Sequence, residues 1–350
     1  MTSLARVVAY FLFVTIIGLF PLLAEQVPEA SAPIKIKVVV VTTFEVGEDT
    51  GDAPGEFQYW VEREKLTEKV DFPGGVRALR MNAAHDVLGM VTGMTLANAG
   101  PSIVALGLDP RFDLSHAYWL VDGIAGVDPA DGTIGTAAWA RYVVNDVNRQ
   151  VDAREMPKDW AYGEFVIGAK QPNEMPARPM TNNAYALNAA LAHWAYALTK
   201  DVKIPDNAAM VADRKRWVGF PKAMQAPVVI EGDSFASDAY WHGKVMTQYA
   251  NEWVKLWTGG KGNFAMANME DSGIAEALQR LEKMHRAEYG RLMVLRVGSN
   301  YSMQAPGQTA VESVTSPYIS STAFEDCWVV GSVVVRELVA HWDKYEKGSW

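Results

Sequence analysis

The stretch Ile34–Thr43, IKIKVVVVTT, begins with alternating apolar and charged residues and continues as a run of valines that ends in two threonines. Such a run is typical of a strand that enters a sheet covered on both faces. Further strands are predicted at Val87–Val91, His116–Val121, Gly135–Val144, Ala226–Glu231 and Leu292–Val297. Helices are predicted at Leu96–Leu108, Thr181–Lys200, Gly243–Trp257, Ser272–Tyr289 and from about Ser321 to Tyr345. Because strands alternate with helices, the sequence predicts an α/β domain with a mixed, largely parallel central sheet flanked by helices.

Small and polar residues follow the ends of several of these strands. Thr92-Gly93-Met94-Thr95 follows one strand, and Asp122-Gly123-Ile124-Ala125-Gly126 ends another. Gly232-Asp233-Ser234-Phe235 and Gly298-Ser299-Asn300 stand in the same position after two later strands. Ligands of open α/β sheets bind at the carboxyl ends of the strands. The sequence therefore predicts a ligand site at this edge.

Composition excludes several classes of function. The formal net charge of the 350 residues is −9. The protein therefore lacks the net positive charge that attracts nucleic acid, and nucleic-acid binding is not expected. The single cysteine, Cys327, cannot form an internal disulfide. The six histidines show no H-x-x-x-H spacing and paired cysteines are missing, so no protein-held metal is expected. The sequence also lacks a G-x-S-x-G elbow, a Walker A loop and a Rossmann G-x-G-x-x-G motif.

The N-terminal segment differs in kind from the rest. Arg6 is the only charge before Glu25, and Val7–Ala24 is almost wholly apolar. This pattern predicts a signal peptide with a short linker over residues 1–32, and therefore a periplasmic or secreted protein. A retained membrane anchor is the alternative, because the run approaches the roughly 20 residues needed to span a bilayer. No other run is that long, so no membrane span is expected in the mature chain.

The domain is predicted to cover residues 33–350, with an insertion of loop and helix at about 145–225. The pattern that predicts strands ends at Asn145, and a stretch rich in proline and charged residues follows. Thr181 is then predicted to cap a helix that continues to Lys200.

Five motifs in a fixed order indicate a family. They are the Thr92–Thr95 loop, the Asp122–Gly126 turn, Gly232–Phe235, the helix start NMEDSGIA at 268–275, and Arg296-Val297-Gly298-Ser299-Asn300. In this order they resemble the nucleoside phosphorylase and nucleosidase superfamily. The signal peptide, the stretch GDSFASDAYWHG at 232–243 and the chain length resemble the purine nucleoside permease family within it. The resemblance spans roughly residues 37–335 and implies a single nucleoside phosphorylase-like domain.

The resemblance implies roles for the residues that hold a purine nucleoside. Glu270 is implied to bind the ribose, because a carboxylate can accept one hydrogen bond from each of two vicinal hydroxyls. Met269 is implied to lie beneath the sugar and Phe44 beside it. Phe235 is implied to stack on the base, with Asp233 and Asn300 also in the base site. Asn300 is further implied to act in catalysis by donating to the base, which suits a 6-oxopurine. Structural alternatives stay open: a dipole-stabilising acid for Glu270, core packing for Phe235 and a loop cap for Asn300.

The nucleophile is left open between phosphate and water. Thr92 and Gly93, with Arg77 and Arg80, are candidates to hold inorganic phosphate as a co-substrate, although the two arginines also suit a solvated loop. If water is the nucleophile, Glu45 or Glu48 in the loop after the first strand is a candidate general base.

Two functions therefore remain. One is an exported enzyme, a nucleosidase or phosphorylase, that cleaves the N-glycosidic bond of purine nucleosides and supports their uptake and salvage. The other is a non-catalytic nucleoside receptor or transport component, which the family name implies. Both take purine nucleosides as ligands, need no cofactor, and are compatible with a homo-oligomer. One fold hosts many functions, so the fold cannot separate them.

Overall fold

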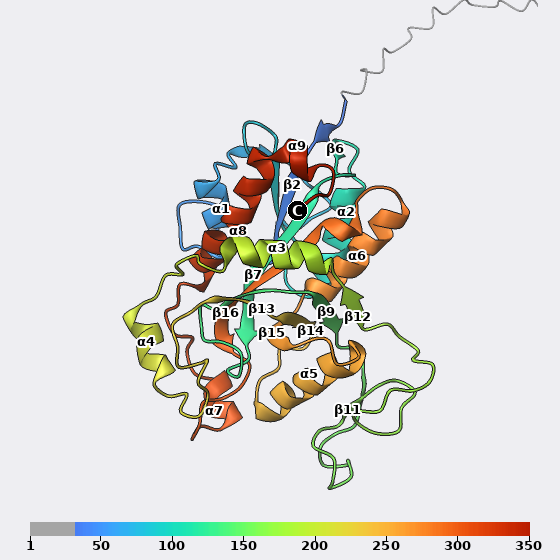
Figure 1. The fold of residues 1–350 in the computed structure, drawn as a ribbon, viewed down its shortest axis with the longest axis vertical. Coiled ribbons are helices and arrows are strands. Elements are labelled where there is room, and N and C mark those ends of the chain that lie inside the picture. Colours follow the sequence, from blue (N-terminus) through green and yellow to red (C-terminus); the bar gives the residue numbers. More distant parts are fainter. Residues whose placement is uncertain (1–31) are drawn as a thin grey trace, which may run out of the picture. The chain divides into compact units, whose positions relative to one another are not determined.

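The two longest strands, β7 (Tyr118–Val127) and β16 (Leu292–Tyr301), run side by side through the middle of the sheet (Figure 1). They belong to a computed structural model that describes residues 32–350. The two strands pair in parallel along nearly their whole length, and one register shift falls between Gly298 and Asn300. This pair is the axis around which the other strands are arranged.

The other edge of β7 is shared by two strands that point toward each other. β2 (Val38–Thr42) runs parallel to β7 and pairs with residues 118–121. β15 (Phe264–Asn268) runs antiparallel and pairs with Gly126 and Val127. Among the described residues, no strand pairs with residues 122–125 of β7 on this edge. The carboxyl ends of β2 and β15 face each other across this gap.

The remaining strands extend the sheet on both sides of the gap. Their bounds are β3 (Glu68–Val70), β4 (Leu79–Met81), β5 (Val87–Val91), β8 (Ala137–Trp139), β9 (Tyr142–Asn145), β12 (Ala184–Ala186), β13 (Val229–Glu231) and β14 (Asp233–Ala236). β5 lies parallel beside β2, followed by β4 and β3, and β14 lies parallel beside β15, followed by β9 and β12. β8 and β13 continue the sheet beyond β16, so the main sheet within residues 32–350 has twelve strands.

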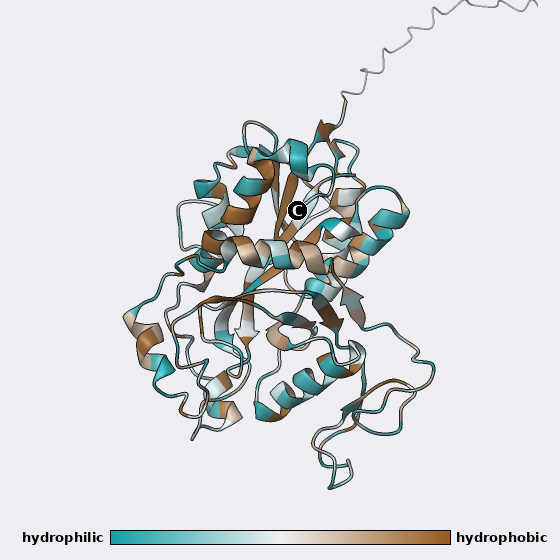
Figure 2. Cartoon of the chain, viewed as in Figure 1, coloured by the Kyte–Doolittle hydropathy of each residue, from teal (hydrophilic) through white to brown (hydrophobic). Residues whose placement is uncertain are grey.

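Helices cover both faces of this sheet. They are α1 (Gln58–Arg63), α2 (Leu96–Gly107), α3 (Ala189–Thr199), α4 (Ala208–Arg214), α5 (Lys244–Trp257), α6 (Asp271–Lys283), α7 (Ala310–Val314), α8 (Ala323–Ala340) and α9 (Trp342–Tyr345). The odd-numbered valines of β2 pack with apolar residues of α2 and α6 on one face, and the even-numbered ones with α1, α3 and α8 on the other. Burial on both faces explains why this strand is a continuous apolar run. Figure 2 shows the hydrophobic residues gathered on the central strands.

The structure confirms the predicted α/β fold with a mixed sheet and flanking helices, and it corrects several elements. Thr181 does not begin a helix: residues 184–186 form β12, and α3 starts after Asn188, whose side chain accepts from Leu191 N. β7 does not stop before Asp122 but continues through the glycines to Val127, because β16 pairs with it throughout. The predicted strand at 135–144 is two strands, β8 and β9.

Two further sheets of two short strands each lie apart from the main sheet, and one of them lies in the long connection between β9 and β13. β1 (Ile34–Lys35) pairs with β6 (Phe112–Asp113), and β10 (Arg149–Gln150) pairs with β11 (Glu164–Phe165). The predicted insertion at about 145–225 falls on this long connection, and its boundaries stay a prediction. The predicted signal peptide falls on residues 1–31, outside the described residues. Among residues 32–350, no helix has both the length and the apolar character to cross a membrane.

Candidate functional site

The gap on the edge of β7 is the place where strand ends converge. β2 and β5 end there from one direction, and β14 and β15 end there from the other. The residues that follow these strands include Thr43, Thr92, Ser237 and Glu270. Ile124 lies in the middle of the gap. Its backbone N–H and C=O form hydrogen bonds with side chains and not with a strand. This arrangement builds a polar centre inside an otherwise apolar sheet.

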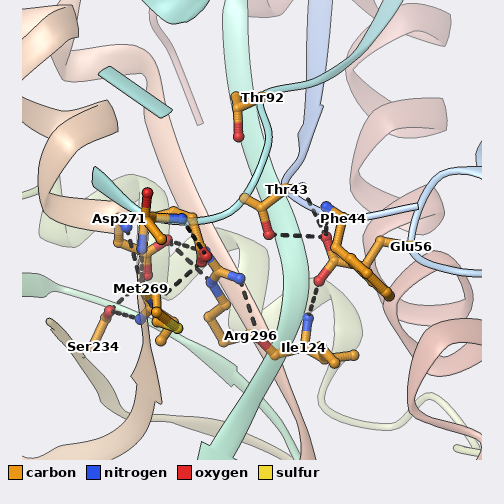
Figure 3. A network of polar contacts seen from close by, with 12 residues as sticks. Thr43, Phe44, Glu56, Thr92, Ile124, Ser234, Met269, Asp271 and Arg296 are labelled. Atoms are coloured by element: carbon orange, nitrogen blue, oxygen red, sulfur yellow. Dashed lines mark hydrogen bonds and ion pairs between the residues drawn. The ribbon is translucent and has the colours of Figure 1, made fainter. Parts of the chain in front are cut away.

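One side of the gap is occupied by the carboxyl group of Glu56, which precedes α1. Its Oε2 accepts hydrogen bonds from Thr43 N at 2.7 Å, Thr43 Oγ1 at 3.1 Å and Phe44 N at 3.0 Å. Its Oε1 accepts from Ile124 N at 2.7 Å. Figure 3 shows this carboxyl group held between the end of β2 and the edge of β7. Glu56 thus replaces the missing strand partner of Ile124.

The other side is occupied by Arg296, a fully buried guanidinium on β16. Its Nε and Nη2 donate to Asp271 Oδ1 at 3.0 and 2.6 Å, and Nη2 also donates to Glu270 Oε2 at 3.1 Å. Its Nη1 donates to Ile124 O at 3.1 Å. A Cβ on Gly123 would lie 2.6 Å from Glu56 Oε1 and 2.7 Å from Arg296 Nη1. Only glycine at this position lets both charged groups approach the strand.

Buried carboxyl groups outnumber cations at this centre. Burial raises the pKa of Glu56 to about 7, although Arg296 and the backbone donors oppose the shift. Burial also raises the pKa of Asp122, whose Oδ2 accepts from Trp60 Nε1 at 2.8 Å, to about 8. Burial lowers the pKa of Arg296, but Asp271 and Glu270 outweigh it and raise that pKa above its ordinary value. Arg296 is therefore a permanent cation among acids of which two titrate near neutral pH.

Glu270 connects this centre to the start of α2. Its Oε1 accepts from Thr95 N at 3.3 Å and its Oε2 from Met269 N at 3.2 Å. Burial raises the pKa of Glu270, while Arg296 lowers it. The neighbouring amide, Leu96 N, donates to Asp238 Oδ1 at 2.8 Å. Two carboxylates of the chain therefore occupy the positive end of the α2 dipole.

The structure brings several of the predicted residues together. Glu270 lies in the gap, where its Oε2 accepts from Arg296. Met269, labelled in Figure 3, is half-buried. Phe44 lies on the opposite side of the gap, where its ring stacks on Phe324 at 6.1 Å between centroids. Asn300 lies beyond them on β16, and its Nδ2 donates to Tyr301 O at 3.1 Å and to Tyr240 Oη at 3.4 Å.

The residues predicted to serve the nucleophile have other roles. The carboxylate of Glu45 accepts from four backbone amides, among them Phe57 N at 2.6 Å and Gln58 N at 2.7 Å, so it holds the loop and the start of α1, and its role as a general base stays a prediction. Arg77 and Arg80 both donate to the carboxylate of Asp49, at 3.1 and 2.8 Å, as residues that hold the loop do, and their binding of phosphate stays a prediction. Glu48 is exposed in the same loop, and its role stays a prediction.

Thr92 and Gly93 shape the turn between β5 and α2, and their binding of phosphate stays a prediction. The Thr92 side chain is fully buried and its hydroxyl donates to Gly93 O at 3.0 Å. The left-handed backbone of Gly93, with φ of +82°, turns the chain from β5 toward α2.

Two predicted base-binding residues belong to the core. Phe235 is fully buried and packs edge-to-face on Trp241, Tyr249 and Phe264, so the prediction that it stacks on a base is wrong. Asp233 is equally buried, and it accepts from Arg141 N and Tyr142 N at 2.9 Å and from Asn263 N at 2.7 Å. Its carboxylate ties β14 to the starts of β9 and β15.

Sequence reasoning missed Glu56 and gave no role to Arg296 or Asp271. Glu56 follows a loop rich in glycine and aspartate and does not stand at a strand end, so no pattern singled it out. Arg296 carried a usable signal, because it is the only charge in the apolar strand LMVLRV and a buried arginine requires a partner. In the described part of the chain, no group of three or more His, Cys, Asp or Glu side chains is arranged to hold a metal ion.

Comparison with known proteins identifies the family. The family model described as purine nucleoside permease matches residues 35–349. The chain belongs to the purine nucleoside permease family. A purine nucleoside permease of Candida albicans is 30% identical to it over 271 residues, which cover 75% of this chain and 67% of the relative. A Schizosaccharomyces pombe protein, named a probable purine nucleoside permease, is 28% identical over 272 residues, or 75% of this chain and 78% of that protein.

Solved structures show that this permease-family chain has the fold of a nucleosidase. A 5′-methylthioadenosine/S-adenosylhomocysteine nucleosidase from Helicobacter pylori matches with a TM-score of 0.51 and 13% identity, over 88% of this chain and 98% of the enzyme. The corresponding enzyme from S. pneumoniae matches with a TM-score of 0.51 and 15% identity, over 87% of this chain and 99% of the enzyme. At such identities the likeness concerns the fold alone. The predicted family and the predicted phosphorylase-like fold are both confirmed.

Proposed function

We propose that this chain binds purine nucleosides as the recognition component of their uptake. One observation carries the proposal: Glu270 presents a carboxylate at the gap, fixed in orientation by Thr95 N and Arg296. A carboxylate held in this way can accept two hydrogen bonds from the vicinal hydroxyls of a ribose. The names of the Candida and fission-yeast relatives, which are permeases, support binding and transport rather than turnover.

Cleavage of the N-glycosidic bond is the second candidate, and Glu56 favours it. A general base works best when its pKa lies near the working pH, and burial raises the pKa of Glu56 to about 7. The nucleophile in this case is water. In the described residues Arg77 and Arg80 already pair with Asp49, and Leu96 N already donates to Asp238, which supports water over phosphate.

A binding experiment tests the main proposal. Calorimetric titration of the purified protein with inosine, guanosine and adenosine should show binding, and Glu270→Ala should weaken it at least tenfold. Glu282→Ala, which changes an exposed glutamate on the same helix, is the matched control and should bind as wild type. Wild-type affinity in Glu270→Ala would contradict the assignment.

Chromatography of the same mixtures separates the two candidates. A receptor returns inosine intact, whereas a nucleosidase releases hypoxanthine whether or not phosphate is present. Release that requires phosphate would contradict both the receptor and the water-based mechanism.

The proposal also places the protein outside the cytoplasm, because the N-terminal residues have the pattern of a signal peptide. Protein from a native host should begin between Glu25 and Ile34. Intact residues 1–24 on membrane-bound material would instead favour the anchor.

A further inference from the structure

A pocket of about 90 Å³ lies beside Asn300, at the carboxyl end of β16. Its lining also comes from Ile134 between β7 and β8, from the loop after β14, from the end of α4 and the residues after it, and from the chain between β16 and residue 319, which includes α7. Typical pockets for whole small molecules measure about 300–1,000 Å³. A pocket of this size therefore suits one part of a ligand rather than a whole nucleoside.

The pocket carries polar groups that point to a ligand. Asn300 Nδ2 donates to Tyr240 Oη at 3.4 Å, and the hydroxyls of Tyr240 and Tyr318 lie 2.8 Å apart. Within residues 32–350, the buried His242 Nε2 has no hydrogen-bond partner. Burial lowers the pKa of His242, so the ring is neutral and can donate or accept at neutral pH. A buried imidazole nitrogen without a partner is costly unless a ligand or water satisfies it.

The walls of the same pocket are aromatic. Trp217 and Tyr301 lie with their ring centroids 3.9 Å apart, and Tyr240 and Tyr318 stand at the rim with exposed fractions of 52% and 67%. Flat aromatic walls combined with hydrogen-bonding edges match a flat heterocycle that carries ring nitrogens and an exocyclic group. A sugar, which has no aromatic face, would use only the polar half of this lining.

The pocket lies at a suitable distance from Glu270 for the two to share one ligand. Arg296, which holds Glu270, pairs with Gly123, and Asn300 pairs with Gly126. Three residues of strand span about 10 Å, a length comparable to a nucleoside. The register shift between Gly298 and Asn300 is a bulge, and bulges re-aim the side chains that follow them.

We propose that this pocket is the base subsite of the nucleoside site. The purine ring lies against Tyr240, Tyr318 and Trp217, with Asn300 and His242 at its polar edges, while the ribose reaches Glu270. The subsite supplies the aromatic stacking on the base that Phe235 cannot supply, because Phe235 is buried in the core. This inference rests on the proposed function and adds the residues that select the heterocycle.

Free bases provide a test that separates the subsite from the ribose site. Hypoxanthine should bind to the purified protein and compete with inosine, because the pocket takes the base alone. Glu270→Ala should weaken the binding of inosine but leave hypoxanthine almost unchanged. Tyr318→Ala should weaken both ligands about 5- to 100-fold by loss of stacking, and Tyr240→Phe about 2- to 10-fold by loss of a hydrogen bond. Tyr196→Phe, on α3 and outside the lining, is the control.

The outcomes distinguish the two claims. Unchanged affinity for both ligands in Tyr318→Ala and Tyr240→Phe, with inosine lost in Glu270→Ala, would overturn the base subsite and leave the proposed function standing. Failure of hypoxanthine to bind the wild-type protein would also overturn the subsite. Failure of inosine to bind would overturn both. Tyr318 is exposed, so its replacement should not unfold the protein, and equal melting temperatures would verify this.

Discussion

Replacing Glu56 by glutamine should change how the stability of the protein depends on pH. In the unfolded chain this carboxyl group titrates at 4.5, and in the folded protein burial raises its pKa to about 7. Below pH 4.5 both states are protonated, and the stability that Glu56 contributes is fully present. As the pH rises through 7 the folded protein must bury an ionised carboxylate, and that stability is lost. A shift of 2.5 units corresponds to about 3 kcal/mol, of which about 2.5 kcal/mol falls between pH 5 and 8.

Glutamine also has an effect that does not depend on pH. Its oxygen can take the place of Oε2 and accept from Thr43 N and Phe44 N, but its amide then faces Ile124 N, which loses its acceptor. An unpaired buried donor costs about 1–3 kcal/mol. The variant should therefore be less stable than the wild type at pH 5, and the difference should close or reverse by pH 8.

Urea denaturation at pH 5, 6, 7 and 8, followed by tryptophan fluorescence, measures both effects. Glu62→Gln, which changes an exposed carboxylate on α1, serves as the control, and its stability curve should run parallel to that of the wild type. A constant difference between Glu56→Gln and the wild type across this range would refute the reasoning, because it would mean that Glu56 does not titrate there.

Three further predictions follow from the same network and its surroundings. Arg296→Met should lower the free energy of unfolding at neutral pH by about 3–5 kcal/mol, because Asp271 is left buried without its cation; a loss below about 1 kcal/mol in urea denaturation would contradict the ion pair. Phe235→Ala should cost about 3–5 kcal/mol of stability, whereas unchanged stability with lost nucleoside binding would restore its stacking role. Inorganic phosphate should leave nucleoside binding and any cleavage unchanged, since Asp238 occupies Leu96 N; a cleavage rate that rises with phosphate would contradict this.

The sequence predicts the architecture well because burial leaves a visible pattern. A strand covered on both faces must be apolar throughout, so β5 is recognised to the residue, whereas the predicted strand at 34–43 is divided into β1 and β2. β7 is misjudged at its end, because glycines normally break strands and only its pairing with β16 keeps residues 122–127 extended. Thr181 does not cap a helix for a related reason. Residues 184–186 pair with β9 as a strand, and no local sequence pattern indicates this pairing.

The site is predicted less completely, because its chemistry depends on distant partners. The order of motifs singles out Glu270 and Asn300, but nothing local shows that Phe235 is enclosed by three aromatic rings. Glu56 is the clearest case. Its raised pKa and its bond to Ile124 N arise only when α1 folds back onto β7, 68 residues further along the chain.

The long pairing of β7 with β16 has a consequence for biosynthesis. β7 is complete at Val127, but the strand that covers its whole second edge ends at Tyr301. At a synthesis rate of about 5–20 residues per second, roughly 10–35 s pass before that edge can close. During this interval the growing chain presents an apolar strand with free N–H and C=O groups, which is a template for aggregation. The nascent polypeptide should therefore depend on holding chaperones until nearly all of it has left the ribosome.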